Sequence, residues 1–121
     1  MTLKALQDCF ALSQNVRLYV PSTLNGQDKA PAQKVDRAVQ DTLKRFSQWF
    51  GGATAYTALG AWFSQDRGKV ITEQVVIVES FTTPEAVDNH LAQVVEWAET
   101  IKEQFAQESV AVEHDHTLYL V

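Results

Sequence analysis

The sequence predicts an α+β fold of the ferredoxin-like kind. Apolar residues recur at steps of three and four over residues 31–50 and 84–105, the period of an amphipathic helix. Residues 16–20, 54–63 and 70–81 alternate or are continuously apolar, as strands are. The order of elements is strand, helix, strand, strand, helix, strand, which is the split βαβ arrangement. We therefore expect a four-stranded antiparallel sheet with both helices on one face.

Local signals place the ends of the first strand and the first helix. The first strand ends at Pro21, and a polar loop over residues 22–30 follows it. Pro31 fits the first turn of a helix, where its missing N–H costs nothing. Gly51 fits the left-handed position that closes a helix. These signals predict one helix between Pro31 and Gly51.

The second half of the chain repeats the pattern. Thr83 is the expected N-cap of the second helix, with Pro84 at its first position. Residues 108–113 read as the fourth strand, and residues 117–121 continue it or return as a fifth. At the other end of the chain, three apolar residues at near-helical spacing predict a short N-terminal helix packed on the domain: Leu3, Leu6 and Phe10.

Composition limits the classes of function. The chain of 121 residues has room for one core, so we expect a single domain over residues 1–121. Its 15 acidic and 10 basic residues give a formal net charge of −5, which disfavours direct binding to nucleic acid. The sequence contains no run of 18 consecutive apolar residues, so it predicts no membrane-spanning helix. We expect a cytoplasmic protein that binds no cofactor. Cys9 is the only cysteine, and we expect it to be buried.

One face of the predicted sheet is left open. Val16, Leu18 and Val20 should face the helices, which leaves Arg17 and Tyr19 on the other side. In the next strand we expect the helices to cover a second alternating set: Thr57, Leu59, Ala61 and Phe63. The strand over residues 70–81 is apolar on both sides, which is typical of a strand that is covered on both faces.

An exposed apolar face on a sheet indicates an interaction surface. The candidate interface residues on this face are Tyr19, Tyr56, Trp62, Val75 and Ile77. We expect a homodimer formed sheet to sheet. The alternatives are that the N-terminal segment or the C-terminal tail covers the face within one chain, or that another protein or a ligand does so.

Three charged residues form a candidate ligand-binding set: Arg17, Glu73 and Glu79. An acid in a largely apolar strand needs a partner, so one of the two glutamates should pair with Arg17 across the sheet. A pocket between the open face and the loop at residues 22–30 could then hold a ligand. The chain has no matched set of nucleophile, histidine and acid, and we predict no catalytic residues.

The run Glu113-His114-Asp115-His116 is the one dense cluster of side chains that could ligate a metal. His114 and His116 are two apart, so on a strand they would share one face and could bind a divalent metal. The interpretation that we favour is a polar β-turn with Asp115 at its centre and no metal.

Three short motifs carry a resemblance to other proteins. Val20-Pro21-Ser22-Thr23, Phe50-Gly51-Gly52-Ala53-Thr54 and Gly60-Ala61-Trp62 together resemble a group of small uncharacterised prokaryotic α+β proteins. The resemblance implies a domain type and a prokaryotic source. It implies no activity and no catalytic residues.

Three hypotheses of function follow. The first is a small non-enzymatic module for protein interaction or regulation, self-associating through the open sheet face. The second is a small enzyme or ligand-binding domain with a pocket near Arg17 and Glu79. The third is an acidic inhibitor or nucleic-acid mimic, since the second helix presents a row of acids: Glu85, Asp88, Glu96, Glu99 and Glu103.

Overall fold

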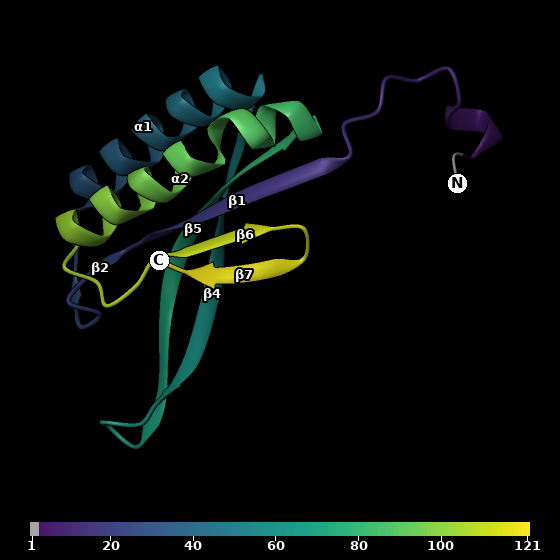
Figure 1. Ribbon diagram of the computed structural model, residues 1–121. Coiled ribbons are helices and arrows are strands. Elements are labelled where there is room, and N and C mark those ends of the chain that lie inside the picture. The colour runs from purple at the N-terminus through teal and green to yellow at the C-terminus, as the bar shows by residue number, and fades with distance from the viewer. Residues whose placement is uncertain (1–2) are drawn as a thin grey trace.

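The computed structural model describes residues 3–121, in which two helices lie across one face of a sheet (Figure 1). The sheet is antiparallel throughout, with strand order β4-β5-β1-β6-β7. Its strands are β1 (Gln14–Pro21), β4 (Thr54–Ser64), β5 (Lys69–Thr82), β6 (Ala111–His114) and β7 (Thr117–Leu120). The helices are α1 (Ala32–Phe50) and α2 (Pro84–Gln104).

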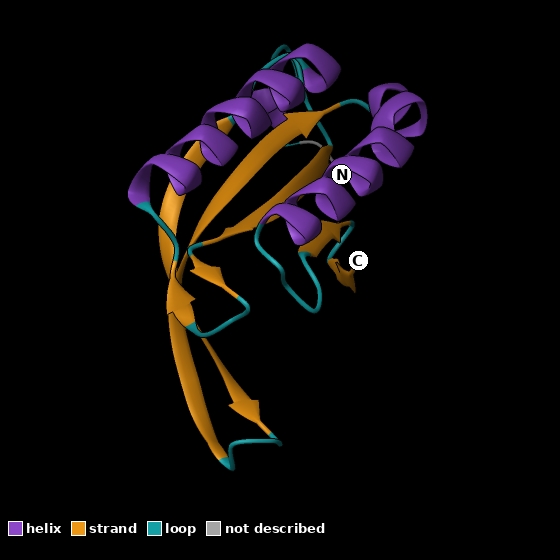
Figure 2. Cartoon of the chain, turned by 90° about the vertical axis from the view of Figure 1, so that its left-hand side faces the viewer, coloured by secondary structure: helices purple, strands orange, loops and turns teal. Residues whose placement is uncertain are grey.

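This arrangement confirms the predicted ferredoxin-like fold. Both helices lie on the same side of the sheet (Figure 2), and β7 is the fifth strand. The predicted loop at residues 22–30 contains a small hairpin of β2 (Thr23–Leu24) and β3 (Asp28–Lys29). Among the described residues, no helix is long and apolar enough to span a membrane.

The helix ends form where the sequence predicts them. Pro31 precedes α1 as its N-cap residue, and Gly51 closes α1 with a φ of 98° while its N–H donates to the Ser47 carbonyl at 2.9 Å. At the start of α2, the Thr83 hydroxyl accepts from the Ala86 N–H at 3.2 Å, and Pro84 occupies the first helical position. Residues with special backbone or capping roles therefore set both ends of α1 and the start of α2.

The core lies between the helices and the sheet. Val16, Leu18 and Val20 of β1 are fully buried there, as the alternation predicts. Leu18 lies opposite Val78 of β5 and Val112 of β6, and both of those are buried as well. Strand β1 is therefore the central strand of the core.

The outer part of β4 and β5 departs from the prediction. The two strands pair from Thr54 with Glu79 to Ser64 with Lys69 and extend well past the helices, at the bottom of Figure 1. Leu59, Phe63 and Val70 are 74%, 57% and 61% exposed on the side that continues the helix-covered face, and we call these three residues the ribbon patch. The prediction that the helices cover Thr57, Leu59, Ala61 and Phe63 is wrong.

The reason is a difference in length. A 19-residue helix such as α1 spans about 28 Å, whereas a 14-residue strand such as β5 spans about 46 Å. The helices therefore cannot cover the whole sheet. An apolar position beyond their ends stays exposed unless another chain covers it.

The N-terminal segment over residues 3–13, which we call the N-terminal arm, also departs from the prediction. It contains only one short 3-10 helix, η1 (Lys4–Leu6), and projects away from the two layers (Figure 1). Its large apolar side chains are exposed, Phe10 to 85%, and Cys9 is exposed too. The expected packing on the domain is wrong because a helix of one turn is too short to align the apolar residues along one face.

Candidate functional site

The open face of the sheet carries a row of charged and aromatic residues. Arg17 of β1 lies directly opposite Glu79 of β5 on one side and Glu113 of β6 on the other. Two residues further along β1, Tyr19 lies opposite Ile77, which in turn lies opposite Tyr56 of β4. Four strands thus place ionisable side chains close together on this face.

The charged residues contact one another directly. Arg17 Nε lies 2.6 Å from Glu79 Oε2, and Arg17 Nη1 lies 3.0 Å from Glu113 Oε2. The Tyr19 hydroxyl donates to Glu113 Oε1 at 3.0 Å, and Asn15 Nδ2 donates to Glu79 Oε2 at 3.3 Å. We call these five residues the carboxylate cluster.

The sequence predicts part of this cluster. The sequence predicts that one of two glutamates pairs with Arg17, and Glu79 does so. Sequence reasoning placed Glu113 in the run around His114 and missed its contact with Arg17. The available signal is that Glu113 lies on the same short strand as the apolar Val112, so the two side chains must point to opposite faces.

The cluster has an excess of negative charge, because one guanidinium faces two carboxylates. The hydrogen bond from Arg17 to Glu79 raises the pKa of the guanidinium, against the effect of burial. Burial, together with the hydrogen bond to Glu113, raises the pKa of the Tyr19 hydroxyl. Tyr19 therefore remains a proton donor at neutral pH.

The raised pKa of Tyr19 predicts a dependence of stability on alkaline pH. The pKa of Tyr19 is higher in the folded than in the unfolded state. The protonated hydroxyl therefore contributes fully to the free energy of unfolding below about pH 10, and this contribution is lost as pH rises through the folded-state pKa. Tyr19→Phe removes the titration, so the fall in unfolding free energy above about pH 10 should be shallower. At pH 7 the variant should lose about 1 kcal/mol with the hydrogen bond to Glu113.

Urea unfolding at several pH values between 7 and 11 measures both effects. Tyr119→Phe is the matched control, since Tyr119 is exposed on β7 and should change neither value. An unchanged alkaline slope in Tyr19→Phe would contradict the assignment.

Glu73, the third residue of the predicted ligand set, lies elsewhere. Its Oε2 accepts from the Thr23 hydroxyl at 2.6 Å, next to the β2–β3 hairpin. Glu73 is six residues from Glu79 along β5, a separation of about 20 Å. The structure therefore brings Arg17 and Glu79 together and leaves Glu73 at a separate position.

A groove of about 410 Å³ lies beside that hairpin, where the start of α1 meets β4 and β5. It is lined by Ser22, Lys29, Ala30, Ala32, Val35, Asp36, Val39, Ala55, Tyr56, Thr57, Gln74, Val75 and Val76. The groove borders the loop at residues 22–30, but it lies against α1, whereas the predicted pocket was to lie on the open face of the sheet. Arg17 and Glu79 do not line it, so it is distinct from the carboxylate cluster.

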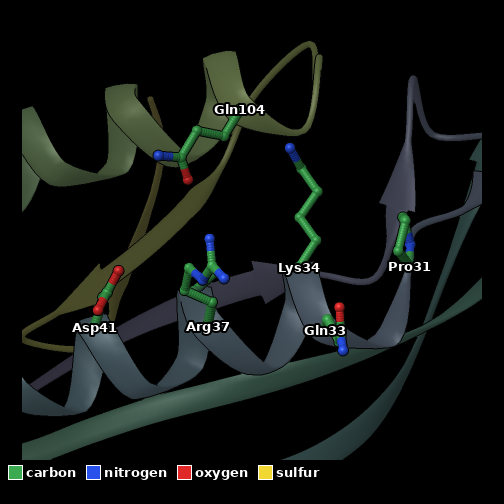
Figure 3. A pocket seen from close by; sticks show the side chains of 7 residues that line it. Pro31, Gln33, Lys34, Arg37, Asp41 and Gln104 are labelled. Carbon is green, nitrogen blue, oxygen red and sulfur yellow. The ribbon is translucent and has the colours of Figure 1, made fainter.

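A second groove, of about 380 Å³, lies between α1 and the end of α2 (Figure 3). It is lined by Pro31, Gln33, Lys34, Arg37, Ala38, Asp41 and Gln104. Lys34 Nζ lies 5.3 Å from the centre of the Phe105 ring, so this cation has an aromatic partner.

The row of acids predicted on the second helix lies on α2 and is exposed throughout, as in a solvated helix face: Glu85, Asp88, Glu96, Glu99 and Glu103.

The predicted interface residues differ in exposure. Tyr56 and Trp62 are exposed, Trp62 to 43%, while Tyr19 and Val75 are half-buried and Ile77 is buried. Three residues that the prediction omitted share the open face by register and are exposed: Phe81, Leu118 and Leu120. Strand β7 extends the sheet, so the C-terminal tail does not fold over the open face.

The His114 region forms the predicted turn. Asp115 and His116 connect β6 to β7 with φ values of 52° and 61°. Positive φ at both positions is typical of the two-residue turns that connect the strands of β-hairpins. His114 Nε2 lies 2.8 Å from Gln14 Oε1. Within residues 3–121, no group of three or more His, Cys, Asp or Glu side chains is placed to hold a metal ion.

Comparison with known proteins supports the fold class. No protein-family model and no curated protein sequence matches the chain. Among solved structures, a phage SAM lyase in complex with S-methyl-5'-thioadenosine matches with a TM-score of 0.65 and 19% identity, covering 99% of this chain and 95% of that chain. A phage SAM lyase in the apo state matches with a TM-score of 0.64 and 21% identity, covering 89% and 87%. These likenesses show a shared ferredoxin-like fold.

A more distant match is the periplasmic divalent cation tolerance protein CutA from Archaeoglobus fulgidus. Its TM-score is 0.48 and its identity 9%, covering 84% of this chain and 79% of that chain.

Proposed function

We propose that this chain is a protein-interaction module that self-associates through its open sheet face. The observation that carries the proposal is a set of five large apolar side chains exposed on that one face: Tyr56, Trp62, Phe81, Leu118 and Leu120. Monomeric proteins rarely expose so many on a single surface.

The size of this surface fits a stable interface. Side chains of this kind bury about 100 Å² each when they are covered from such exposures. A two-fold contact uses the same residues from both copies, so the total reaches about 1,000 Å², the lower limit for a specific interface.

Trp62→Asp tests the proposal. The side chain is exposed on the outer half of β4, so the fold should tolerate the change, while a buried charge at the interface should weaken self-association by at least about 100-fold. Multi-angle light scattering over a range of concentrations measures the mass. Val95→Asp is the matched control, because Val95 is an exposed apolar residue on α2, away from the open face.

Two outcomes would reject self-association through this face. One is a wild-type protein that remains at 13.5 kDa at high concentration. The other is a Trp62→Asp variant that associates as tightly as the wild type.

The second candidate function is the binding of an organic cation at the carboxylate cluster. Two half-buried carboxylates there face one guanidinium, and Tyr19 and Tyr56 flank them. Carboxylates and aromatic rings together suit an organic cation. The likeness to the phage SAM lyase over nearly the whole chain suggests an adenosyl sulfonium, a compound in which the sulfur of such a thioether carries a third carbon substituent and a positive charge.

Calorimetric titration with S-adenosylmethionine and with S-methyl-5'-thioadenosine tests this candidate. If the carboxylates recognise the positive sulfur, the charged compound should bind more tightly than the neutral thioether. Glu79→Gln should then weaken binding of the charged compound by about tenfold, a loss of roughly 1.4 kcal/mol, with little change for the thioether. Glu103→Gln on the exposed face of α2 is the control, and equal losses for both ligands would reject a role for the carboxylates.

A further inference from the structure

Besides the open face of the sheet, two apolar surfaces within residues 3–121 are exposed. The N-terminal arm exposes four large apolar side chains: Leu3, Leu6, Phe10 and Leu12. The ribbon patch exposes three more, on the part of β4 and β5 that extends beyond the helices. A two-stranded ribbon has little stability in water by itself, so a covering surface would stabilise this one.

Phe10 and Leu12, the two exposed apolar residues of the arm nearest to β1, cannot reach the ribbon patch of their own chain. Strand β1 begins at Gln14, opposite Thr82, whereas Leu59 lies opposite Gln74, eight residues or about 26 Å along β5. Phe10 is only four residues before Gln14, so a fully extended backbone carries it about 14 Å at most. In Figure 1 the N-terminal arm and the tip of the β4–β5 ribbon lie on opposite sides of the molecule.

We propose that the N-terminal arm of each copy packs on the ribbon patch of a second copy. Each chain supplies one arm and one patch, so every copy in a closed assembly buries both surfaces. At about 100 Å² for each of the seven side chains, two such contacts bury about 1,400 Å² in total, within the range of specific interfaces.

This inference rests on self-association, but it uses a different surface. The ribbon patch and Trp62 lie on opposite faces of the sheet, because consecutive residues of a strand, such as Trp62 and Phe63, point to opposite faces. The arm contact and the open-face contact can therefore be tested separately.

Disulfide formation from Cys9, the one cysteine of the chain, tests the arm contact. Thr72 is exposed on β5, on the same face as the ribbon patch, and Thr72→Cys places a second thiol there without removing an apolar residue. The two thiols cannot meet within one chain: Cys9 lies five residues before Gln14, at most about 18 Å, while Thr72 lies ten residues or about 33 Å from Thr82. A bond between them must therefore join two copies.

The purified full-length variant is oxidised under mild conditions, and the linked peptides are identified by mass spectrometry. Glu99→Cys, on the exposed side of α2, is the matched control. We expect the Cys9-to-residue-72 link to exceed the Cys9-to-residue-99 link by at least about tenfold, because docking raises the local concentration of the thiols. Deleting residues 2–12 should weaken self-association by at least about 100-fold.

Each outcome decides between the two proposals. Equal yields of the two links, or no link to residue 72, would overturn the arm contact. If Trp62→Asp abolishes self-association while the Thr72→Cys variant forms no link to residue 72, only the arm contact fails. If the link to residue 72 forms and Trp62→Asp has no effect on the mass, the arm contact stands and the open-face contact fails.

Discussion

Replacing Arg17 by methionine is expected to lower the free energy of unfolding by about 2–4 kcal/mol. Arg17 lies between Glu79 and Glu113 in the register of the sheet and contacts both carboxylates at 2.6 and 3.0 Å. Without it, two half-buried negative charges remain on one face, on the two strands that flank β1, with no other cation placed beside them by the described residues. Methionine keeps most of the side-chain length, so the loss reports the charge more than the packing.

A second background separates charge from packing. In a Glu79→Gln, Glu113→Gln protein, no unpaired carboxylate is left behind, and Arg17→Met should cost only about 1 kcal/mol. Urea unfolding of the four proteins at pH 7 provides the comparison. Equal losses in both backgrounds would show that the cluster contributes through packing alone.

The parts of the fold that depend on local chemistry could be predicted from the sequence. Gly51 takes a left-handed conformation that other residues rarely adopt, and Thr83 with Pro84 starts a helix through its own hydrogen bond and fixed φ. The alternation in β1 divides its two faces because successive strand residues point to opposite sides. None of these signals needs knowledge of distant parts of the chain.

The exposure of Leu59 and Phe63 could not be predicted in this way. Their apolar alternation is the same whether a helix of the same chain or a second copy covers them. Whether Leu59 and Phe63 are exposed depends on the length of β5 relative to α1, and this is known only once the elements are assembled. The sequence pattern thus reports that a residue is suited to being covered and does not report by what.

The same limit applies to the carboxylate cluster. Glu73 and Glu79 lie on the same face of β5, so alternation alone makes both of them candidates to pair with Arg17. The register of β1 with β5 places Glu79, and not Glu73, opposite Arg17. Glu73 instead lies opposite Gly60 and near Thr23. Glu113 joins the cluster through a pairing of β1 with β6 that spans 96 residues of sequence. A long-range register of this kind leaves no local signal.

Phe46→Ala is expected to have the largest effect on stability, a loss of about 3–5 kcal/mol. Phe46 is fully buried in the C-terminal part of α1, and its ring meets that of Phe50 edge-on with 5.4 Å between centres. Truncation removes apolar area and leaves a cavity that the packed helices cannot close. The loss is a large part of the roughly 5–15 kcal/mol that stabilises a domain.

Phe10→Ala is the matched control, because it makes the same chemical change at a side chain that is 85% exposed. In urea unfolding at a concentration where the protein is monomeric, Phe10→Ala should change the free energy by less than about 0.5 kcal/mol. At concentrations where the protein self-associates, Phe10→Ala should have a larger effect than it has on the monomer, because it weakens assembly through the arm contact. Phe46→Ala acts on the fold of each copy at every concentration. If Phe10→Ala destabilises the monomer as much as Phe46→Ala does, the arm packs on its own chain and cannot be the element that joins two copies.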